Sequence, residues 1–412
     1  MTWRIFGVIV GLWAATAGAQ TAYAGKYEKD AAFQRFVKDV PRLKQAAIDH
    51  VKRRLGIMSP APGAIEIAII DCIPEKPEKI ARYSGAAFET TTTDAAKKMV
   101  RITLRSEFIV SKRFDPLIEF KHEMVHAVMR QLVEPAAYER LPKWLREGLA
   151  VEAAGQTEER LIHAMLSADA FDDPGPVIEG LGTGRFSLER YGEAGAALEW
   201  LRRRDKDPAY ERFVAAIVRD ADIESALKDA YGLASAAYFA ETRTATAQRC
   251  NELRPLVWDD YLSVKKADKE RRYADVRKQA DALLPKVKGG PLLDRVLYMH
   301  GKAARLQQEP ALAKISLQRL LNECGGRSDF FDEGLYQLGT VLAATKDAKG
   351  AAAAFERCVR DVPDASVLDK CLLGWAGALL DLNEKERARA GLGLYEASFG
   401  DDAGLAALKA RL

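Results

Sequence analysis

The sequence predicts an α+β protein that is mostly helical, in which a small sheet with helices is followed by an all-α array of helical hairpins. Three observations predict this fold class. Short runs at 64–70 and 99–104 are rich in β-branched residues or alternate in character, as strands do. Apolar residues recur at helical spacing through most of the remaining chain. Beyond about residue 265, glycines recur at an even spacing of 38 residues, which is typical of a repeat.

Composition and charge narrow the classes of protein that fit. The chain has 412 residues, with 62 basic and 59 acidic side chains, and this length allows two or three domains. The nearly balanced charge provides no basic surface of the kind that nucleic acids need, so we expect no nucleic-acid partner. None of the five cysteines has C-x-x-C spacing, which argues against a cysteine-based metal or redox motif.

The start of the chain has the pattern of a secretory signal. A short basic segment at 1–4 precedes an apolar run at 5–17, and small residues at 17–19 and 22–24 fit the A-x-A cleavage rule. We therefore expect a signal peptide over 1–24 and a periplasmic or secreted mature protein, with no membrane segment in the mature form. An uncleaved anchor is the alternative, because the run is only somewhat short for a membrane span.

Secondary structure before residue 115 follows from periodicity. The segment 27–56 is amphipathic and helical, with an expected interruption at Pro41. Strands are predicted at 64–70 and 99–104. The polar segment 89–98 is expected to link them.

The motif His122-Glu123-x-x-His126 is the strongest chemical signal in the chain. Asp115 is a good N-cap and Pro116 suits the first helical position, so a helix is predicted over 116–134. Residues four apart lie on one face of a helix, which lets both imidazoles point at one metal ion. Glu123 lies beside them, where it can act on a metal-bound water.

A catalytic zinc usually has three protein ligands and one open position, so a third ligand is required. A second helical pattern begins near residue 141 and ends at Gly155. Glu147 stands in this pattern among apolar residues, where a carboxylate needs a strong partner such as a divalent cation. We therefore predict one Zn²⁺ per chain, held by His122, His126 and Glu147.

These residues resemble a known family. His122-Glu123-x-x-His126 followed by Trp144-Leu145-x-Glu147-Gly148-Leu149-Ala150 resembles the gluzincin zinc metallopeptidases, in particular peptidase MA-like domains, which are related to the aminopeptidase N clan. The resemblance implies that Glu147 is the third zinc ligand and that an edge strand of a small sheet binds substrate. It also implies a helical lobe, matched here by 189–203, 210–219 and 223–231. We place this domain at 25–248.

Tyr191 begins a segment, 191–201, that resembles the aminopeptidase segment whose tyrosine helps to bind the transition-state oxyanion. This resemblance implies a catalytic role for Tyr191. The alternative is a core tyrosine with its hydroxyl at the rim, which is common where a tyrosine begins an apolar helix face.

The C-terminal part resembles tetratricopeptide repeats. In the middle unit the small, aromatic and proline positions of such a repeat are filled by Gly339, Ala351, Phe355, Cys358 and Pro363. Gly301 and Gly377 mark weaker copies on either side. We predict a helical linker over 249–284 and a tetratricopeptide-like repeat domain over 285–412, with generic helical hairpins as the alternative.

The exported location allows disulfides. Cys358 and Cys371 lie about equally far from the predicted turn at 363–365, so adjacent antiparallel helices would place them level, and we predict that they pair. A Cys72–Cys250 pair follows only by elimination, which leaves Cys324 as the odd cysteine.

Together these patterns predict an exported zinc-dependent metallopeptidase that hydrolyses a peptide or protein substrate through a zinc-bound water activated by Glu123. The alternative is a periplasmic helical-repeat scaffold with a catalytically silent metallopeptidase-like domain and a protein partner on the repeats. A chance occurrence of the histidine motif is a further alternative. The presence of Glu123 favours the enzyme, because two histidines and Glu147 would bind zinc without a general base.

Overall fold

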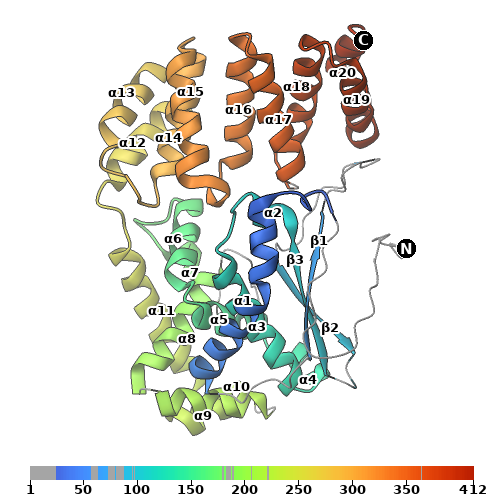
Figure 1. The fold of residues 1–412 in the computed structure, drawn as a ribbon. Helices are drawn as coiled ribbons and strands as arrows, with labels where there is room; N and C mark the ends of the chain where they lie inside the picture. The colour runs from blue at the N-terminus through green and yellow to red at the C-terminus, as the bar shows by residue number, and fades with distance from the viewer. Residues whose placement is uncertain are drawn as a thin grey trace.

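A computed structural model describes residues 25–56, 64–72, 79, 88–94, 96, 98–178, 181, 187, 190–205, 207–219, 222–362 and 364–412. The predicted signal peptide, 1–24, lies outside these residues. Figure 1 shows two tiers: a lower tier with a small sheet and helices α1 to α11, and an upper tier in which helices α12 to α20 stand side by side. The mostly helical fold with a small sheet confirms the predicted class at this level.

The sheet has three strands, β1 (Ile65–Ile70), β2 (Phe88–Asp94) and β3 (Met99–Arg105), in the order β1-β3-β2. β1 runs parallel to β3, with Ile67 opposite Ile102, and β2 runs antiparallel to β3, with Thr90 opposite Ile102. The predicted strands at 64–70 and 99–104 are confirmed.

The prediction that 89–98 is only a link is wrong, because most of this polar segment forms β2. The segment contains four successive threonines, Thr90 to Thr93. Threonine is β-branched and favours extended backbone, even where no apolar alternation marks a strand. β2 lies at the edge of the sheet, which explains its polar character.

Helix α1 (Ala31–Leu55) is continuous, so the predicted interruption at Pro41 is wrong. A proline inside a helix removes one backbone hydrogen bond, but its fixed φ angle suits the helix. The helix buries an apolar face against the N-terminal core and packs on α3 (Pro116–Leu132). This burial outweighs the local cost of Pro41.

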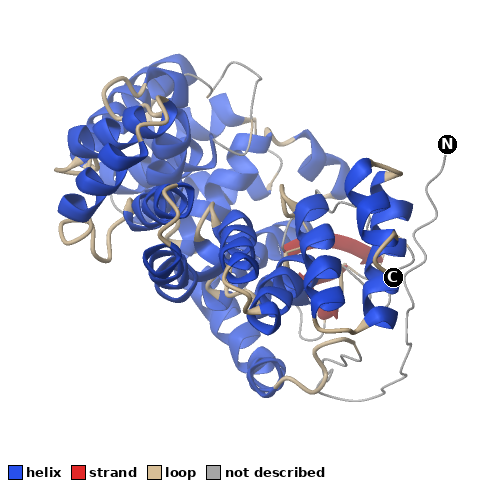
Figure 2. Ribbon diagram, turned by 90° about the horizontal axis from the view of Figure 1, so that it is seen from above, coloured by secondary structure: helices blue, strands red, loops and turns tan. Residues whose placement is uncertain are grey.

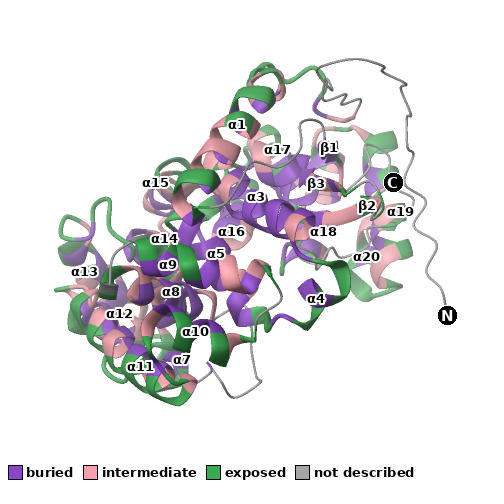
Figure 3. Cartoon of the chain, turned by 90° about the horizontal axis from the view of Figure 1, so that it is seen from below, coloured by how far each residue is buried: buried purple, intermediate pink, exposed green. Residues whose placement is uncertain are grey.

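Three central helices, α3, α5 (Lys143–Ala154) and α8 (Tyr191–Asp205), hold the candidate site and are largely buried in Figure 3. Asp115 caps α3 by accepting hydrogen bonds from two backbone amides, and Gly155 ends α5 with a φ of 76°. A Cβ at Gly148 would lie 2.8 Å from the backbone oxygen of Ala194, so only glycine lets α8 approach α5 this closely.

The remaining helices of the lower tier surround these three. The segments predicted at 210–219 and 223–231 correspond to α9 and α10. The bounds of these helices are α2 (Ser106–Val110), α4 (Pro135–Arg140), α6 (Thr157–Ala168), α7 (Gly175–Ile178), α9 (Asp207–Val218), α10 (Ile223–Tyr231) and α11 (Ser235–Glu252).

The upper tier consists of four successive helical hairpins and a closing helix. Each first helix ends near a residue in the left-handed conformation, with φ of 58° to 61°, namely Arg271, Gln308, Lys346 and Asn383. The hairpins are α12 (Trp258–Lys269) with α13 (Tyr273–Leu283), α14 (Leu293–Leu306) with α15 (Pro310–Arg319), α16 (Phe331–Ala344) with α17 (Ala348–Asp361), and α18 (Leu368–Asp381) with α19 (Lys385–Phe399), followed by α20 (Ala403–Lys409).

The first of these hairpins lies in the region predicted as a helical linker. Like the other hairpins, it has a residue in the left-handed conformation shortly after its first helix. The glycine that marks the later hairpins is absent from α12, so the sequence period did not reveal it.

Contacts near the ends of the hairpin helices attach the array to the lower tier. The hydroxyl of Tyr27 donates to Asp361 Oδ1 at 2.8 Å, and Gly326 N donates to Ser111 O at 3.0 Å. At the other end, Trp258 is buried with its ring centroid 4.9 Å from that of Phe171. In Figure 2, seen from above, the sheet lies beneath the C-terminal end of the array.

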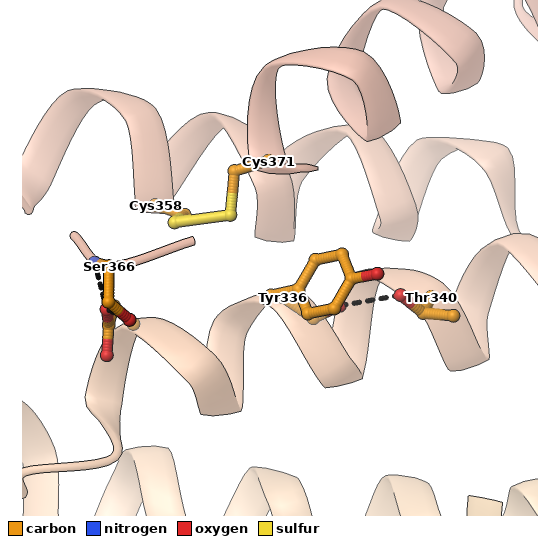
Figure 4. The surroundings of a disulfide bond; sticks show 6 residues. Tyr336, Thr340, Cys358, Ser366 and Cys371 are labelled. Carbon is orange, nitrogen blue, oxygen red and sulfur yellow. Dashed lines mark hydrogen bonds between the residues drawn. A yellow bond between two sulfur atoms is a disulfide. The ribbon is translucent and has the colours of Figure 1, made fainter. Parts of the chain in front are cut away.

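The predicted disulfide is confirmed: Cys358 of α17 pairs with Cys371 of α18, with 6.3 Å between their Cα atoms (Figure 4). Cys72, Cys250 and Cys324 are free thiols, so the Cys72–Cys250 pairing is not formed. Cys72 follows β1 near the sheet, whereas Cys250 is buried in the core around α11 and α12. Among the described residues, none of the helices has both the length and the apolar character to cross a membrane.

Two glycines at equivalent repeat positions provide a test of the array's packing. A Cβ at Gly339 would lie 2.6 Å from the ring of Phe355, whereas a Cβ at Gly377 would meet nothing closer than Leu408 at 3.6 Å. We expect Gly339→Ala to lower the free energy of unfolding by about 1–3 kcal/mol through overpacking. Gly377→Ala should raise it by about 0.5–1 kcal/mol, since alanine favours the helix. Urea unfolding of both variants measures this, and a shift of the same sign in both would contradict it.

Candidate metal centre

Helices α3 and α5 bring the three predicted ligands together, each with one donor atom pointing at a common centre. His122 Nε2 and His126 Nε2 are 3.3 Å apart. Glu147 Oε2 lies 3.5 Å from His122 Nε2 and 3.4 Å from His126 Nε2. The histidines come from successive turns of α3, and Glu147 comes from α5, which packs against it.

These distances fit a zinc ion. Donors at about 2.0–2.1 Å from one tetrahedral ion are separated from each other by about 3.4 Å, which is the spacing of these three atoms. Two imidazoles and a carboxylate are also the donor types that zinc prefers. Among the described residues, His122, His126 and Glu147 form the group of side chains whose ligand atoms lie close enough together to hold one metal ion.

The electrostatics of the triad favour a cation. Burial raises the pKa of Glu147, but hydrogen bonds to His122 and His126 lower it by more, and the pKa falls well below its usual range. Burial lowers the pKa of His122, but the neighbouring carboxylates of Glu147, Glu123 and Glu119 outweigh burial and raise it. Negative charge therefore surrounds the point at which the donors meet.

Gln156 and Glu119 hold the ring of His122. Gln156 Nε2 donates to Glu119 Oε1 at 2.8 Å, so the other amide atom, Oε1, accepts from His122 Nδ1 at 2.7 Å. This bond places the ring proton on Nδ1 and leaves the lone pair of Nε2 pointing at the centre. Burial raises the pKa of Glu119.

Tyr138 of α4 holds the second histidine, with its hydroxyl 3.1 Å from His126 Nδ1. The guanidinium carbons of Arg130 and Arg146 lie 4.4 Å and 5.1 Å from the centre of the Tyr138 ring, and both arginines bind Glu139. Burial raises the pKa of Tyr138 to about 12, so its hydroxyl stays neutral at physiological pH. The sequence did not single out Tyr138 or Gln156, because neither belongs to a local motif.

Glu123 lies beside the triad and is held by a residue of β2. Its Oε2 accepts a hydrogen bond from Thr90 Oγ1 at 2.6 Å, and both residues are buried. The carboxylate of Glu123 is thereby fixed next to the donors without being one of them. Thr90 belongs to the strand that the sequence did not predict, and the threonine run is the signal that could have found it.

Tyr191, at the start of α8, also reaches this site, where it hydrogen-bonds to Glu147. Burial and the negative charge of Glu147 raise the pKa of Tyr191, so the hydroxyl stays protonated and can act as a donor. The next residue, Gly192, fits tightly against α6, since a Cβ there would lie 2.5 Å from Leu161 N.

All five predicted site residues line one open cleft of about 440 Å³. Its walls carry four arginines as well as acidic and aromatic side chains. Asp364, in the loop between α17 and α18, is also part of the wall and lies 2.6 Å from Arg113 Nη1. The repeat array therefore contributes directly to the cleft.

Comparison with known proteins identifies one of the repeats. Residues 333–365 match the tetratricopeptide repeat family, and this range covers most of α16 and all of α17. The match confirms the tetratricopeptide-like prediction for the unit in which the sequence pattern was clearest. No curated protein and no solved structure is significantly similar to the chain.

The donor geometry predicts the metal content of variants. His122→Ala, His126→Ala and Glu147→Ala should each lose most of the zinc that the wild-type chain retains, because two remaining protein ligands bind the ion far more weakly than three. Glu123→Gln should retain it. Elemental analysis after dialysis measures the zinc, and equal contents in wild type and Glu147→Ala would remove Glu147 from the site.

Thr90 is expected to act through Glu123 and not through the metal. Thr90→Val removes a hydrogen bond to a carboxylate, and we expect turnover of any cleaved substrate to fall about 10-fold while zinc content stays the same. Thr91→Val is the matched control, since neighbouring strand residues point to opposite faces. Equal turnover in the two variants would show that Thr90 has no such role.

Proposed function

We propose that the protein is an exported zinc-dependent metallopeptidase of the gluzincin type, with a domain similar to peptidase MA-like domains. The observation that carries the proposal is the arrangement of His122, His126 and Glu147 at tetrahedral separations, with Glu123 fixed beside them. A structural zinc site usually fills all four positions with protein ligands, whereas this site offers three ligands and a separately held carboxylate in an open cleft.

Bound zinc would supply Lewis-acid chemistry, polarising a peptide carbonyl and lowering the pKa of a water molecule. Glu123 is placed to accept a proton from water and to pass it to the leaving amine, and the bond from Thr90 keeps its carboxylate in one orientation. The protonated hydroxyl of Tyr191 would donate a hydrogen bond to the oxyanion as it forms.

The sheet supports a substrate-binding role for β2. Among the described strands β2 pairs only with β3, so its other edge can accept an extended peptide by strand addition. β2 also carries Thr90, so a peptide bound along this edge would lie close to Glu123.

Export is supported by two independent observations. The signal pattern over 1–24 predicts it, and the Cys358–Cys371 disulfide is typical of oxidising compartments. We accordingly propose a metallopeptidase domain over 25–248 and a repeat domain over 285–412. The helical segment 249–284 between them contains the hairpin of α12 and α13.

A second candidate function is a scaffold that binds a protein partner on the repeats, with a catalytically silent metallopeptidase-like domain. The tetratricopeptide match favours an interaction role, since stacked repeats present extended binding surfaces. The two candidates differ in whether the chain turns over a substrate.

Cleavage of an unfolded protein substrate by the purified mature chain decides between them. We expect zinc-dependent cleavage that Glu123→Gln lowers by at least about 100-fold, because the general base is lost while the zinc ligands remain. The variant must retain zinc and its thermal midpoint for the comparison to hold. A wild-type chain that binds zinc but cleaves nothing would favour the scaffold.

Tyr191→Phe separates a catalytic tyrosine from a core tyrosine. Loss of an oxyanion donor should lower turnover roughly 100- to 1000-fold, with zinc content and thermal midpoint nearly unchanged. Loss of a buried structural hydrogen bond should instead cost about 1 kcal/mol or more of stability. Turnover and thermal midpoint are measured beside wild type, and full turnover would leave Tyr191 without a catalytic role.

A further inference from the structure

Four arginines line the cleft, and three of them have carboxylate partners. Arg113 pairs with Asp364 at 2.6 Å. Arg130 and Arg146 pair with Glu139 at 3.0 Å and 2.9 Å. The fourth, Arg160 of α6, has no side-chain hydrogen bond or ion pair with any residue that the structure describes.

The position of Arg160 puts it close to the reacting groups. Its guanidinium carbon lies 5.9 Å from the centre of the Tyr191 ring, and the Tyr191 hydroxyl hydrogen-bonds to Glu147 of the triad. Glu119 interacts with Arg160 through its charge, but the carboxylate of Glu119 accepts its hydrogen bond from Gln156 and not from Arg160. Arg160 is half-buried, so its partly desolvated charge favours an anionic partner.

We propose that Arg160 binds a carboxylate of the substrate, within one or two residues of the bond that is cleaved. This inference rests on the proposed peptidase function and specifies its substrate class. A guanidinium offers two parallel N–H donors that match a carboxylate, which gives both affinity and orientation. The carboxylate belongs either to an aspartate or glutamate side chain or to the free C-terminus of the peptide.

Lys143 provides a matched control. Its Nζ atom also lies 5.9 Å from the centre of the Tyr191 ring, but Lys143 is exposed on α5 and is not among the residues that line the cleft. Lys143 therefore controls for the loss of a positive charge at the same distance from the Tyr191 ring. Only removal of Arg160 takes a donor out of the cleft.

Binding is measured with the zinc-loaded mature Glu123→Gln protein, so that no turnover intervenes. Three fluorescent peptides of equal length are compared: a neutral peptide with an amidated C-terminus, the same peptide with one glutamine replaced by glutamate, and the neutral peptide with a free C-terminus. We expect one or both carboxylate peptides to bind about 10-fold more tightly than the neutral one, and the preferred peptide identifies the source of the carboxylate.

Adding Arg160→Gln should abolish this preference, and adding Lys143→Gln should leave it in place. Arg160→Lys, which retains the charge but not the paired donors, should retain part of it, and it carries the test if Arg160→Gln does not fold. Equal binding of all three peptides, or an unchanged preference in Arg160→Gln, would overturn the role of Arg160 and leave the peptidase proposal standing. Failure of every peptide to bind would overturn both.

Discussion

The close approach of α5 to α3 is the constraint on which the lower tier depends. His122 and His126 are neighbours on one helix, but Glu147 reaches them only because α5 lies tightly between α3 and α8. Gly148, next to Glu147, has no side chain to hold α8 away, and the backbone of Ala194 occupies the space. A single close contact therefore sets both the third donor and the start of α8, where Tyr191 lies.

Hydrogen bonds from groups around the triad fix the orientation of its side chains and of Glu123. Gln156 and Tyr138 each hold one imidazole through Nδ1, and Thr90 holds the carboxylate of Glu123. These partners come from three separate segments of the chain, so the side chains of the site are held in place only when the whole lower tier is folded. Mutation of a group that hydrogen-bonds to a metal ligand commonly lowers metal affinity 10- to 100-fold, although that group does not touch the ion.

The sequence predicted those parts of the site whose geometry is local. The spacing of His122 and His126, the cap at Asp115 and the stop at Gly155 depend on residues within one or two helical turns, and all appear as expected. Glu147 was found because it lies in a recognisable motif.

The features that the sequence did not predict depend on contacts between distant segments, or on the balance between local backbone preference and the burial of apolar side chains in the folded chain. Gln156 and Tyr138 carry no local signature, and their roles follow only from packing. Pro41 is unfavourable inside an isolated helix, yet burial of one face of α1 outweighs it. β2 lacks apolar alternation because it is an edge strand, so only the β propensity of its threonines could have indicated it.

The repeat array contacts the lower tier both at the cleft and away from it, and the contacts at the cleft contribute less stability than the buried ones. The pair of Arg113 and Asp364 at the cleft is about one-third exposed on each side, and such pairs contribute about 0–1 kcal/mol. Trp258, in contrast, is fully buried against Phe171, and the bond from Tyr27 to Asp361 is buried as well. These buried contacts fix the array in place. The weak pair at the cleft can therefore open without detaching the array, so the proposed peptide binding at the cleft and the proposed partner binding on the repeats are compatible within one chain.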